Sequence, residues 1–415
     1  MALLSNRIQK VKPSPTLAIA AKAKELQARG LDVIDLGSGE PDFDTPKHIK
    51  KAAIQAIQAG FTKYTAVDGI PELKKAIIAK FQRDNQLSFE PSQIVVTVGG
   101  KQAFYNLAQA MLNPGDEVII PAPYWVSYPD MVLLADGVPV IVASREEDGF
   151  KITPDQLAAA ITPRTRFVVI NSPSNPSGAA YTREELLHLG EVIERHPHVW
   201  AVVDDIYDQL VYDGFKAVTL TEVLPALSER TVIVHGVSKT YSMTGWRIGY
   251  AAGPVEIIRA MGKMQSQSTS NATSIAQKAA VAALDGPQKV IKPMLKAFAE
   301  RRHFVVKALN DIPGIHCRAP EGSFYVFPNV GGLIGTRTPD GQEIKSSLEL
   351  AAFMLDAHQL ALVPGVAFGM DPYIRISFAT SMDNLQRAMV RIRQVSRDLL
   401  GESSNHLSPI PQWGS

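Results

Sequence analysis

Lys239 lies in a short segment whose side chains suit one kind of covalent chemistry. The segment runs Ser238-Lys239-Thr240-Tyr241-Ser242-Met243-Thr244-Gly245-Trp246-Arg247. A lysine amine can form a Schiff base with an aldehyde, while hydroxyl groups and an arginine can bind a phosphate. Pyridoxal phosphate (PLP) is the cofactor that carries both groups, so we expect Lys239 to hold PLP. The same amine, once freed by a substrate, would be the base that moves a proton.

A second candidate is the acidic residue Asp204, which follows the strand-like run of residues 200–203. PLP acts as an electron sink while its ring nitrogen is protonated, and a buried carboxylate keeps it so. We prefer Asp204 to Asp205 because it directly follows the strand. Tyr207, one turn later, could donate to the ring oxygen. Both residues also have ordinary structural explanations, as a helix N-cap and a core aromatic.

A phosphate site is indicated by Gly99-Gly100, which come between a strand-like and a helix-like run. Two glycines at a helix start leave backbone N–H groups and the positive end of the helix dipole free for an anion. Arg247 would add paired donors, with Ser238 completing the site.

Arg375 is centred in a short apolar run, residues 373–378. An arginine in such a position is costly to bury unless it is paired. Its expected partner is the α-carboxylate of an amino acid, held by two parallel hydrogen bonds. The alternative is an edge-strand arginine that faces water. If Arg375 belongs to a smaller domain, substrate binding would draw that domain shut and exclude water.

The elements that must position these residues alternate between strand-like and helix-like runs. Strands are predicted at residues 93–98, 117–120, 166–170, 200–203 and 231–235, and helices at 101–111 and 183–194, the second opened by a capping box at Thr182 and Glu185. This alternation predicts an α/β fold with a mostly parallel sheet and helices on both faces. The candidate residues follow strands, so we expect them to meet at the carboxyl edge of the sheet.

The character of the sequence changes near residue 290. Helices are predicted at 292–310, 348–358 and 383–399, with strands at 324–327, 360–363 and 373–377. We therefore predict a large domain at 51–290 and a smaller α+β domain at 291–402. Residues 1–50 are expected to join the smaller domain, and 403–415, polar with prolines, to form a loose tail.

The composition excludes several classes of function. The 415 residues carry a formal net charge of +1, which leaves no basic field for nucleic acid. Neither a membrane span nor a signal peptide is expected, because no apolar run is long enough. The single cysteine, Cys317, excludes an internal disulfide and fits a reducing compartment, so a cytoplasmic protein is expected. The nine histidines show no paired ligand spacing for a metal.

Several motifs together resemble the class I (fold type I) PLP-dependent aminotransferases from about Lys10 to Leu399, in particular the bacterial aspartate aminotransferases of subgroup 1b. The segments that carry the resemblance are Lys12-Pro13-Ser14, Gly39-Glu40-Pro41-Asp42-Phe43, Lys63-Tyr64-Thr65, Gly99-Gly100-Lys101-Gln102-Ala103, Pro123-Tyr124-Trp125-Val126-Ser127-Tyr128, Asn175-Pro176, Asp204 to Tyr207, Ser238 to Gly249 and Ile374 to Thr380. The resemblance implies a seven-stranded central sheet with a smaller α+β domain, and a homodimer with shared active sites.

The resemblance also implies roles for individual residues. Trp125 is expected to stack on the PLP ring, and Tyr64 to reach the cofactor phosphate of the neighbouring subunit. Asn175, which by its Asn-Pro setting could equally be a turn residue, would contact the ring oxygen and the substrate carboxylate. Gly39 would lie beside that carboxylate. One departure is Gly236, which is a serine that binds phosphate in several relatives, so the phosphate site here must rely on other donors.

The substrate expected from the resemblance is a dicarboxylate. In this subgroup a lysine at the position of Lys101 reads the distal carboxylate, and a lysine at the position of Lys12 is associated with accepting prephenate. Lys101 could otherwise face solvent at its helix start, although cations are disfavoured there. Lys12 could likewise be a solvated lysine. We predict ping-pong transamination of L-aspartate with 2-oxoglutarate, giving oxaloacetate and L-glutamate.

Alternatives on the same scaffold are a prephenate, alanine or aromatic aminotransferase, or a C–S lyase. A non-catalytic regulator that senses PLP is disfavoured, because such proteins carry a DNA-binding segment and no basic helix-turn-helix pattern is seen.

Overall fold

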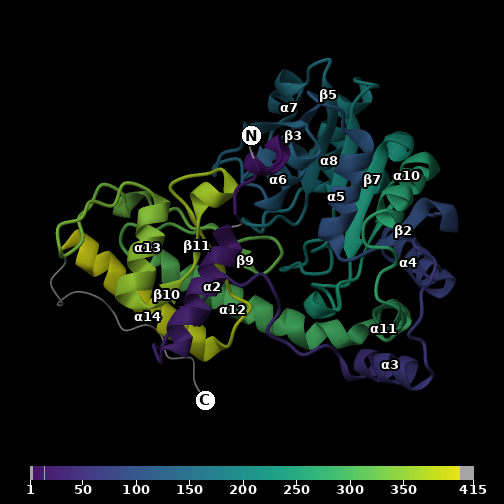
Figure 1. Ribbon diagram of the computed structural model, residues 1–415. Helices are drawn as coiled ribbons and strands as arrows, with labels where there is room; N and C mark the ends of the chain where they lie inside the picture. The colour runs from purple at the N-terminus through teal and green to yellow at the C-terminus, as the bar shows by residue number, and fades with distance from the viewer. Residues whose placement is uncertain (1–2, 14, 402–415) are drawn as a thin grey trace.

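The computed structural model describes residues 3–13 and 15–401, in two units that lie side by side and are joined by the long helix α12 (Lys292–Asn310) (Figure 1). We call the unit built on the larger sheet the large domain and the other the small domain. The loose tail predicted at 403–415 lies outside the described residues. Within the described part of the chain, no helix is long and apolar enough to cross a membrane.

The large domain is built on one seven-stranded sheet. Its strands, in spatial order, are β2 (Ile94–Thr97), β8 (Gly249–Ala252), β7 (Thr231–Gly236), β6 (Trp200–Asp204), β5 (Thr165–Asn171), β3 (Glu117–Ala122) and β4 (Val138–Ala143). Strands β7, β6, β5, β3 and β4 are parallel, while β8 is antiparallel to both of its neighbours. The expectation of a mostly parallel seven-stranded sheet is confirmed.

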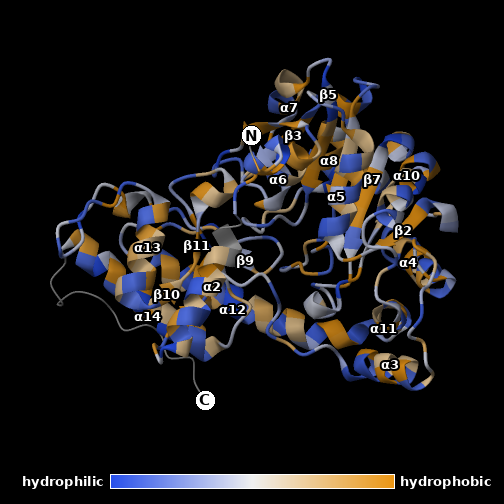
Figure 2. Ribbon diagram, viewed as in Figure 1, coloured by the Kyte–Doolittle hydropathy of each residue, from blue (hydrophilic) through white to orange (hydrophobic). Residues whose placement is uncertain are grey.

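Apolar residues cover both faces of this sheet, because successive side chains of a strand point to opposite sides. On β5, Phe167 and Val169 pack with helices α5 (Gly100–Met111), α6 (Ser127–Leu134) and α10 (Val255–Ser266), whereas Val168 and Ile170 pack with α7 (Pro154–Ala160), α8 (Arg183–Glu194) and α9 (Leu220–Val223). Figure 2 shows these strands as hydrophobic ribbons between helices with one polar side. The inner strands such as β5 are therefore buried on both faces, as their continuous apolar runs require, whereas the edge strand β4 is partly exposed.

Helices at the β2 edge complete the large domain. The helix α4 (Pro71–Asn85) and α11 (Ser274–Asp285) pack in one core cluster with residues of β2, β7 and β8, and α3 (Lys47–Gln58) packs against α11 (Figure 1). The capping box predicted at the start of α8 is present, since Thr182 and Glu185 bond each other's backbone N–H.

The small domain combines both ends of the chain. Its three-stranded antiparallel sheet has the order β11 (Val363–Pro364), β12 (Ile374–Ser377) and β9 (Tyr325–Val326), packed with α13 (Ser347–His358) and α14 (Met382–Leu400). A separate parallel pair joins β1 (Ile34–Asp35) to β10 (Leu360–Ala361), next to α2 (Pro15–Ala28). In contrast, the short α1 (Asn6–Gln9) lies against α6 of the large domain (Figure 1).

Some strands differ from those predicted from the sequence. The strand predicted at 360–363 is two strands, β10 and β11, because the chain changes sheets at Leu362. Strands β4 and β8 were not predicted. The β8 sequence, Gly-Tyr-Ala-Ala, is poor in β-branched residues, and its Gly249 is required because a Cβ there would clash with the backbone of Gly99 and Gly100.

The 3-10 helices are η1 (Pro91–Gln93), η2 (Pro225–Arg230), η3 (Thr244–Trp246), η4 (Gln288–Ile291), η5 (Gly331–Leu333) and η6 (Gly365–Phe368).

Candidate active site

Four loops meet at the carboxyl edge of the large sheet. Strands β2, β5, β6 and β7 all run in one direction and are followed, respectively, by Gly99, by the loop with Asn175, by the turn after Asp204, and by Lys239. The small domain adds Arg375 from β12. This is the convergence that strand order at the edge of an α/β sheet produces.

The amine of Lys239 is held in a polar, half-buried place. Its Nζ donates to the backbone carbonyl of Gly39. The pKa of Lys239 is lowered to about 8, chiefly by burial and further by the positive charges of Arg375 and Arg247, while the Glu40 carboxylate opposes this shift. A substantial fraction of this amine is therefore neutral near pH 7 to 8, which is the form that attacks an aldehyde or accepts a proton.

The carboxylate of Asp204 is buried at the end of β6, 7% exposed. Its Oδ2 accepts from the hydroxyl of Tyr128 at 2.6 Å, and its Oδ1 accepts from the N–H of Ile206 at 3.3 Å. Burial raises the pKa of Asp204, although both hydrogen bonds favour the ionised form. A cation placed here, such as a protonated ring nitrogen, would lower this pKa and be stabilised in return.

Arg375 is 2% exposed and is the centre of a candidate anion site. Its Nη1 donates to Oδ1 of Asn175 at 2.9 Å and its Nη2 to the carbonyl of Gly37 at 2.6 Å. The guanidinium lies 4.5 Å from the ring centroid of Tyr325 and 5.1 Å from that of Phe368. Within the described residues its Nε has no hydrogen-bond partner. A buried guanidinium with a free donor suits a carboxylate ligand.

Tyr207 and Tyr325 link this anion site to the sheet edge. Tyr207, 3% exposed, lies in the turn after β6, and its hydroxyl is 3.1 Å from that of Tyr325. A Cβ on Gly39 would lie 3.2 Å from the same Tyr325 hydroxyl, so a side chain at Gly39 would crowd the site.

An anion cradle lies at the start of α5. Gly99 has a φ of 79°, a backbone conformation that favours glycine, and it lies against the guanidinium of Arg247. Gly100 opens the helix, and Ser238 is buried beside Lys239. Backbone N–H groups, a helix N-terminus and an exposed arginine together fit a phosphate.

Lys101 lies over the ring of Trp125, with Nζ 5.1 Å from the ring centroid. Burial and the nearby charge of Arg247 lower the pKa of Lys101. Trp125 in turn makes an edge contact with Tyr128, with ring centroids 5.1 Å apart, and Tyr128 is the residue that bonds Asp204. Lys101 and Trp125 therefore belong to the same cluster.

Two predicted residues lie apart from this cluster in the single chain. Tyr64 is 91% exposed. Lys12 is exposed, and its backbone N–H bonds the carboxylate of Asp130 on α6, a group whose pKa burial raises.

Gly236 has a structural reason for being glycine. It is paired with Gly249 across β7 and β8, and a Cβ on it would lie 3.0 Å from the carbonyl oxygen of Ile248. A serine would require the two strands to shift by a few tenths of an ångström. The candidate phosphate donors near this position are Gly99, Gly100, Ser238 and Arg247.

Three residues of the cluster were not predicted from the sequence to act there. Tyr128 bonds Asp204, Tyr325 connects Tyr207 with Arg375, and Glu40 acts on the pKa of Lys239. The signal for Tyr128 was its position three residues after Trp125 at the start of α6. Tyr325 and Glu40 carried no such signal.

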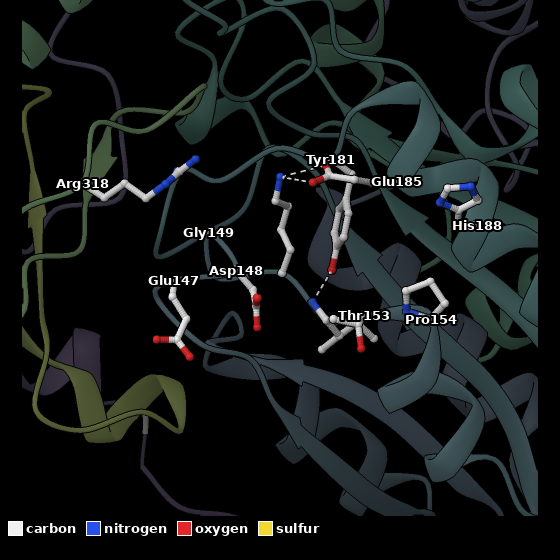
Figure 3. A pocket seen from close by; sticks show the side chains of 11 residues that line it. Glu147, Asp148, Gly149, Thr153, Pro154, Tyr181, Glu185, His188 and Arg318 are labelled. Carbon is white, nitrogen blue, oxygen red and sulfur yellow. Dashed lines mark hydrogen bonds and ion pairs between the residues drawn. The ribbon is translucent and has the colours of Figure 1, made fainter.

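A cavity of about 430 Å³ lies elsewhere, between residues 147–154 and 181–188 of the large domain and Arg318 of the small domain. Figure 3 shows Arg318 on one side and Glu185 and His188 on the other. Its charges are paired, Lys151 with Glu185 at 2.5 Å and Arg318 with Glu321. None of the predicted site residues lines it, so it is not the candidate active site. In the described residues there is also no group of three acidic, histidine or cysteine residues that could hold a metal.

Comparison with known proteins agrees with this chemistry. Residues 31–392 match the family of class I and II aminotransferases. The chain is 58% identical to the aspartate/prephenate aminotransferase of Cereibacter sphaeroides over 95% of this chain and 98% of that one. It is 53% identical to the aspartate aminotransferase of Rhizobium meliloti over 94% and 95% of the two chains.

Solved structures show the same fold. The crystal structure of the aspartate aminotransferase from Rhizobium meliloti superposes with a TM-score of 0.93 at 51% identity, covering 96% of this chain and all of that one (100%). The aspartate aminotransferase from Thermus thermophilus with maleate has a TM-score of 0.89 at 43% identity, covering 95% of this chain and 100% of that one.

Proposed function

The chain belongs to the class I and II aminotransferases, enzymes that use PLP, and we propose that it transfers the amino group of L-aspartate to 2-oxoglutarate. The observation that carries the proposal is a pair of cationic groups in one cluster: Arg375, whose charge acts on Lys239, and Lys101, which lies over the ring of Trp125. A dicarboxylic amino acid presents two carboxylates, one for each group. The relatives named above act on aspartate by their names, which supports this choice.

The residues present fit PLP, and their assignment is part of the proposal. Lys239 would hold the aldehyde carbon covalently, Asp204 the ring nitrogen, and Tyr207 and Asn175 the ring oxygen. The phosphate would be bound by Gly99, Gly100, Ser238 and Arg247, with Lys101 at the same helix start and Trp125 on the ring face. When bound, the cofactor supplies the sink for the electrons of the broken α-bond.

The chain's own groups would orient the substrate and move one proton. Arg375 fixes the α-carboxylate with Asn175 beside it, and Gly39 leaves room for that carboxylate. Lys101 binds the distal carboxylate as a point charge. The freed Nζ of Lys239 would take the α-proton and deliver it to the former aldehyde carbon of the cofactor, across the intervening nitrogen, which its lowered pKa permits near neutral pH. The oxo acid leaves, and 2-oxoglutarate enters the same two carboxylate sites in the second half of the ping-pong cycle.

A homodimer is the assembly that we propose. Tyr64 is 91% exposed, and Ile54 and Ile57 on α3 are each 54% exposed. Large exposed apolar and aromatic side chains in one region favour an interface with a second copy. In such a dimer, Tyr64 of the partner subunit would reach the phosphate, as the resemblance implies.

The boundaries of the domains are likewise proposed as 1–50 with 291–402 for the small domain and 51–290 for the large domain. The pairing of β1 with β10 supports assigning the N-terminal segment to the small domain. A reducing, cytoplasmic setting is proposed from the single cysteine, Cys317, which is buried.

Prephenate is a second candidate amino acceptor. Lys12 is present and exposed next to α6, and the relative from Cereibacter sphaeroides is named an aspartate/prephenate aminotransferase. The two activities share one site and are compatible.

The test is a single-turnover absorbance measurement with PLP-loaded protein and, separately, L-aspartate, L-alanine and L-phenylalanine. Fastest conversion of the bound cofactor to its amine form with L-aspartate is expected. The variant Lys101→Met should lose this preference without losing conversion by L-alanine. Equal or faster wild-type conversion with another donor would refute the aspartate assignment. Replacing 2-oxoglutarate with prephenate in the second half-reaction tests the second candidate.

A further inference from the structure

Glu146 of the large domain binds three residues of the small domain. Its Oε1 lies 2.9 Å from Nδ1 of His316, and its Oε2 accepts from Nδ2 of Asn329 at 3.2 Å and from the hydroxyl of Tyr373 at 3.1 Å. The carboxylate is partly buried, with 21% of its side chain exposed. One acidic side chain thus connects the two domains at three points.

The three partners lie side by side on the small domain. Asn329 forms antiparallel bridges to His316 on one side and to Tyr373 on the other. Glu146 therefore spans three adjacent extended segments rather than contacting one flexible side chain. These hydrogen bonds hold the three segments in place relative to Glu146, because moving any one of the segments would break a bond.

Phe150 adds an apolar contact from the same turn. We call residues 145–151 the docking turn, which is closed by the bridge between Arg145 and Lys151. The Phe150 ring lies 5.6 Å from that of Phe327 and 5.3 Å from that of Tyr373. Its φ of 60° is unusual for a bulky residue. In this conformation the Phe150 ring packs against the small domain.

The other side of the docking turn faces open space. Glu147, Asp148, Gly149 and Lys151 line the cavity of about 430 Å³ described above, and Figure 3 shows Glu147 and Asp148 on the side of the cavity away from Tyr181. The described contacts of the turn with the Tyr373 strand are therefore those of Glu146 and Phe150. A substitution at Glu146 would therefore weaken the contact between the docking turn and the Tyr373 strand without changing the packing of a hydrophobic core.

The strand held in this way carries the arginine of the anion site. Tyr373 directly precedes β12, and Arg375 follows two residues later, on the same side of the extended chain. Arg375 in turn reaches back to Asn175 of the large domain. Docking of Tyr373 on Glu146 and binding of a carboxylate by Arg375 thus require the same placement of one strand.

We propose that Glu146 is a positioning residue for the substrate: by holding Tyr373, it keeps the β12 strand where Arg375 can bind the α-carboxylate. The proposal rests on the proposed function, in which Arg375 binds that carboxylate. It assigns no contact of Glu146 with substrate or cofactor. Loss of Glu146 would lower the population of the docked strand, and apparent affinity falls by the same factor.

The test compares Glu146→Ala with Glu146→Gln and with the matched control Glu147→Gln, whose carboxylate pairs with Arg145 at 2.8 Å. Glu146→Ala is expected to raise KM for L-aspartate and for 2-oxoglutarate together, by about fivefold to twentyfold, with kcat within about twofold. Glu146→Gln keeps an oxygen acceptor and should restore much of the loss. Glu147→Gln should match the wild type.

Two readouts do not depend on turnover. Calorimetry with maleate, a dicarboxylate without an amino group, should show a rise in Kd for Glu146→Ala that parallels KM. Hydrogen exchange of residues 373–377 should become faster, while PLP absorbance and PLP affinity stay unchanged. If Glu146→Ala fails to fold, Tyr373→Phe removes one of the three bonds and should show the same pattern at smaller size.

Unchanged KM, maleate Kd and exchange in Glu146→Ala would overturn the proposal. So would a loss of kcat and PLP affinity in step with KM, which indicates general structural damage. A wild-type protein that binds maleate but does not transaminate aspartate would refute the proposed function alone, since the binding and exchange measurements would still test Glu146.

Discussion

The guanidinium of Arg375 and the amide oxygen of Asn175 are hydrogen-bonded at 2.9 Å although they lie 200 residues apart in the chain and on different domains. The bond leaves Nε of Arg375 without a partner among the described residues, in a place where the side chain is 2% exposed. A buried charge with a free donor is costly unless a ligand completes it. The site is thus arranged for an anion that both domains share.

We therefore predict that Arg375→Lys weakens catalysis on every amino acid. Lysine keeps the charge but cannot make the two-bond fork, and losing one charged hydrogen bond costs about 1.5–3 kcal/mol. The expected fall in kcat/KM is roughly tenfold to a hundredfold. Steady-state kinetics with L-aspartate and L-alanine would measure it, with PLP absorbance as the control. A loss confined to L-aspartate would instead assign Arg375 to the distal carboxylate.

The position of the site could be predicted from the sequence because it depends on strand order. Asp204 and Lys239 each follow a buried apolar run, and strands of one direction bring such residues to one edge. The chemistry of Lys239 could be inferred from the hydroxyl residues and the arginine that follow it in the sequence. Both signals are local in the sequence, and the tertiary structure agrees with them.

What could not be predicted depends on tertiary packing. Tyr325 contacts Tyr207 and Arg375 from an apolar segment that the sequence pattern assigns to the core, and Glu146 is one of five charged residues in the docking turn. Gly249 of β8 makes room for the start of α5, a contact with a segment about 150 residues earlier in the chain. The periodicity of a sequence describes local structure and does not predict contacts between segments that are distant in the chain.

The pKa of Lys239 leads to a prediction about cofactor uptake. The amine reacts in its neutral form, and burial lowers its pKa to about 8. The rate at which the cofactor-free protein takes up PLP should therefore rise with pH and level off above about 8, rather than near the ordinary value of about 10.4. Absorbance of the bound cofactor, checked by borohydride trapping at Lys239, measures this rate.

A matched variant tests the cause. The Glu40 carboxylate raises the pKa of Lys239, so Glu40→Gln should move the midpoint of uptake to lower pH. A midpoint that stays near that of a free lysine in both proteins would show that the amine is not desolvated as the structure indicates.

A buried ion network behind the site leads to a prediction about stability. Nζ of Lys80 lies 2.6 Å from Oδ2 of Asp208, and Nε2 of His235 lies 3.1 Å from the same oxygen. Burial alone would raise the pKa of Asp208, but the charges of Lys80 and His235 outweigh it and hold this pKa far below its ordinary value. Asp208→Asn would leave the buried Lys80 with only the more distant carboxylate of Asp84, at 3.8 Å, which costs about 3 kcal/mol in free energy of unfolding.

The sign of the pH dependence follows from the lowered pKa. Asp208 stabilises the folded state fully above the pKa of an unfolded aspartate, about 3.9, and less as the pH falls below it. Urea unfolding of wild type and Asp208→Asn should therefore differ most at neutral pH and converge in acid. Asp148→Asn, at a partly exposed ion pair with Arg145 in the docking turn, is the control and should change stability by less than about 1 kcal/mol. Equal effects of the two variants would contradict the prediction.

The exposed Tyr64 leads to a prediction about shared sites. If Tyr64 of one subunit completes the phosphate site of the other, then in a mixed dimer the Tyr64→Ala change of one subunit and the Lys239→Ala change of the other fall in the same site. One site then has both changes, and the other has neither. Unfolding and refolding an equal mixture of the two inactive variants should recover about a quarter of the wild-type activity, because half of the randomly formed dimers are mixed and each has one intact site.

Each variant refolded alone is the control and should stay far below this value. If Tyr64 instead served its own subunit, a mixed dimer would have no intact site, and the mixture would be no more active than its components. Cofactor content separates this outcome from failed refolding, since subunits with an intact Lys239 should still bind PLP covalently. Recovery with PLP bound to half of the subunits would establish that Tyr64 acts across the interface.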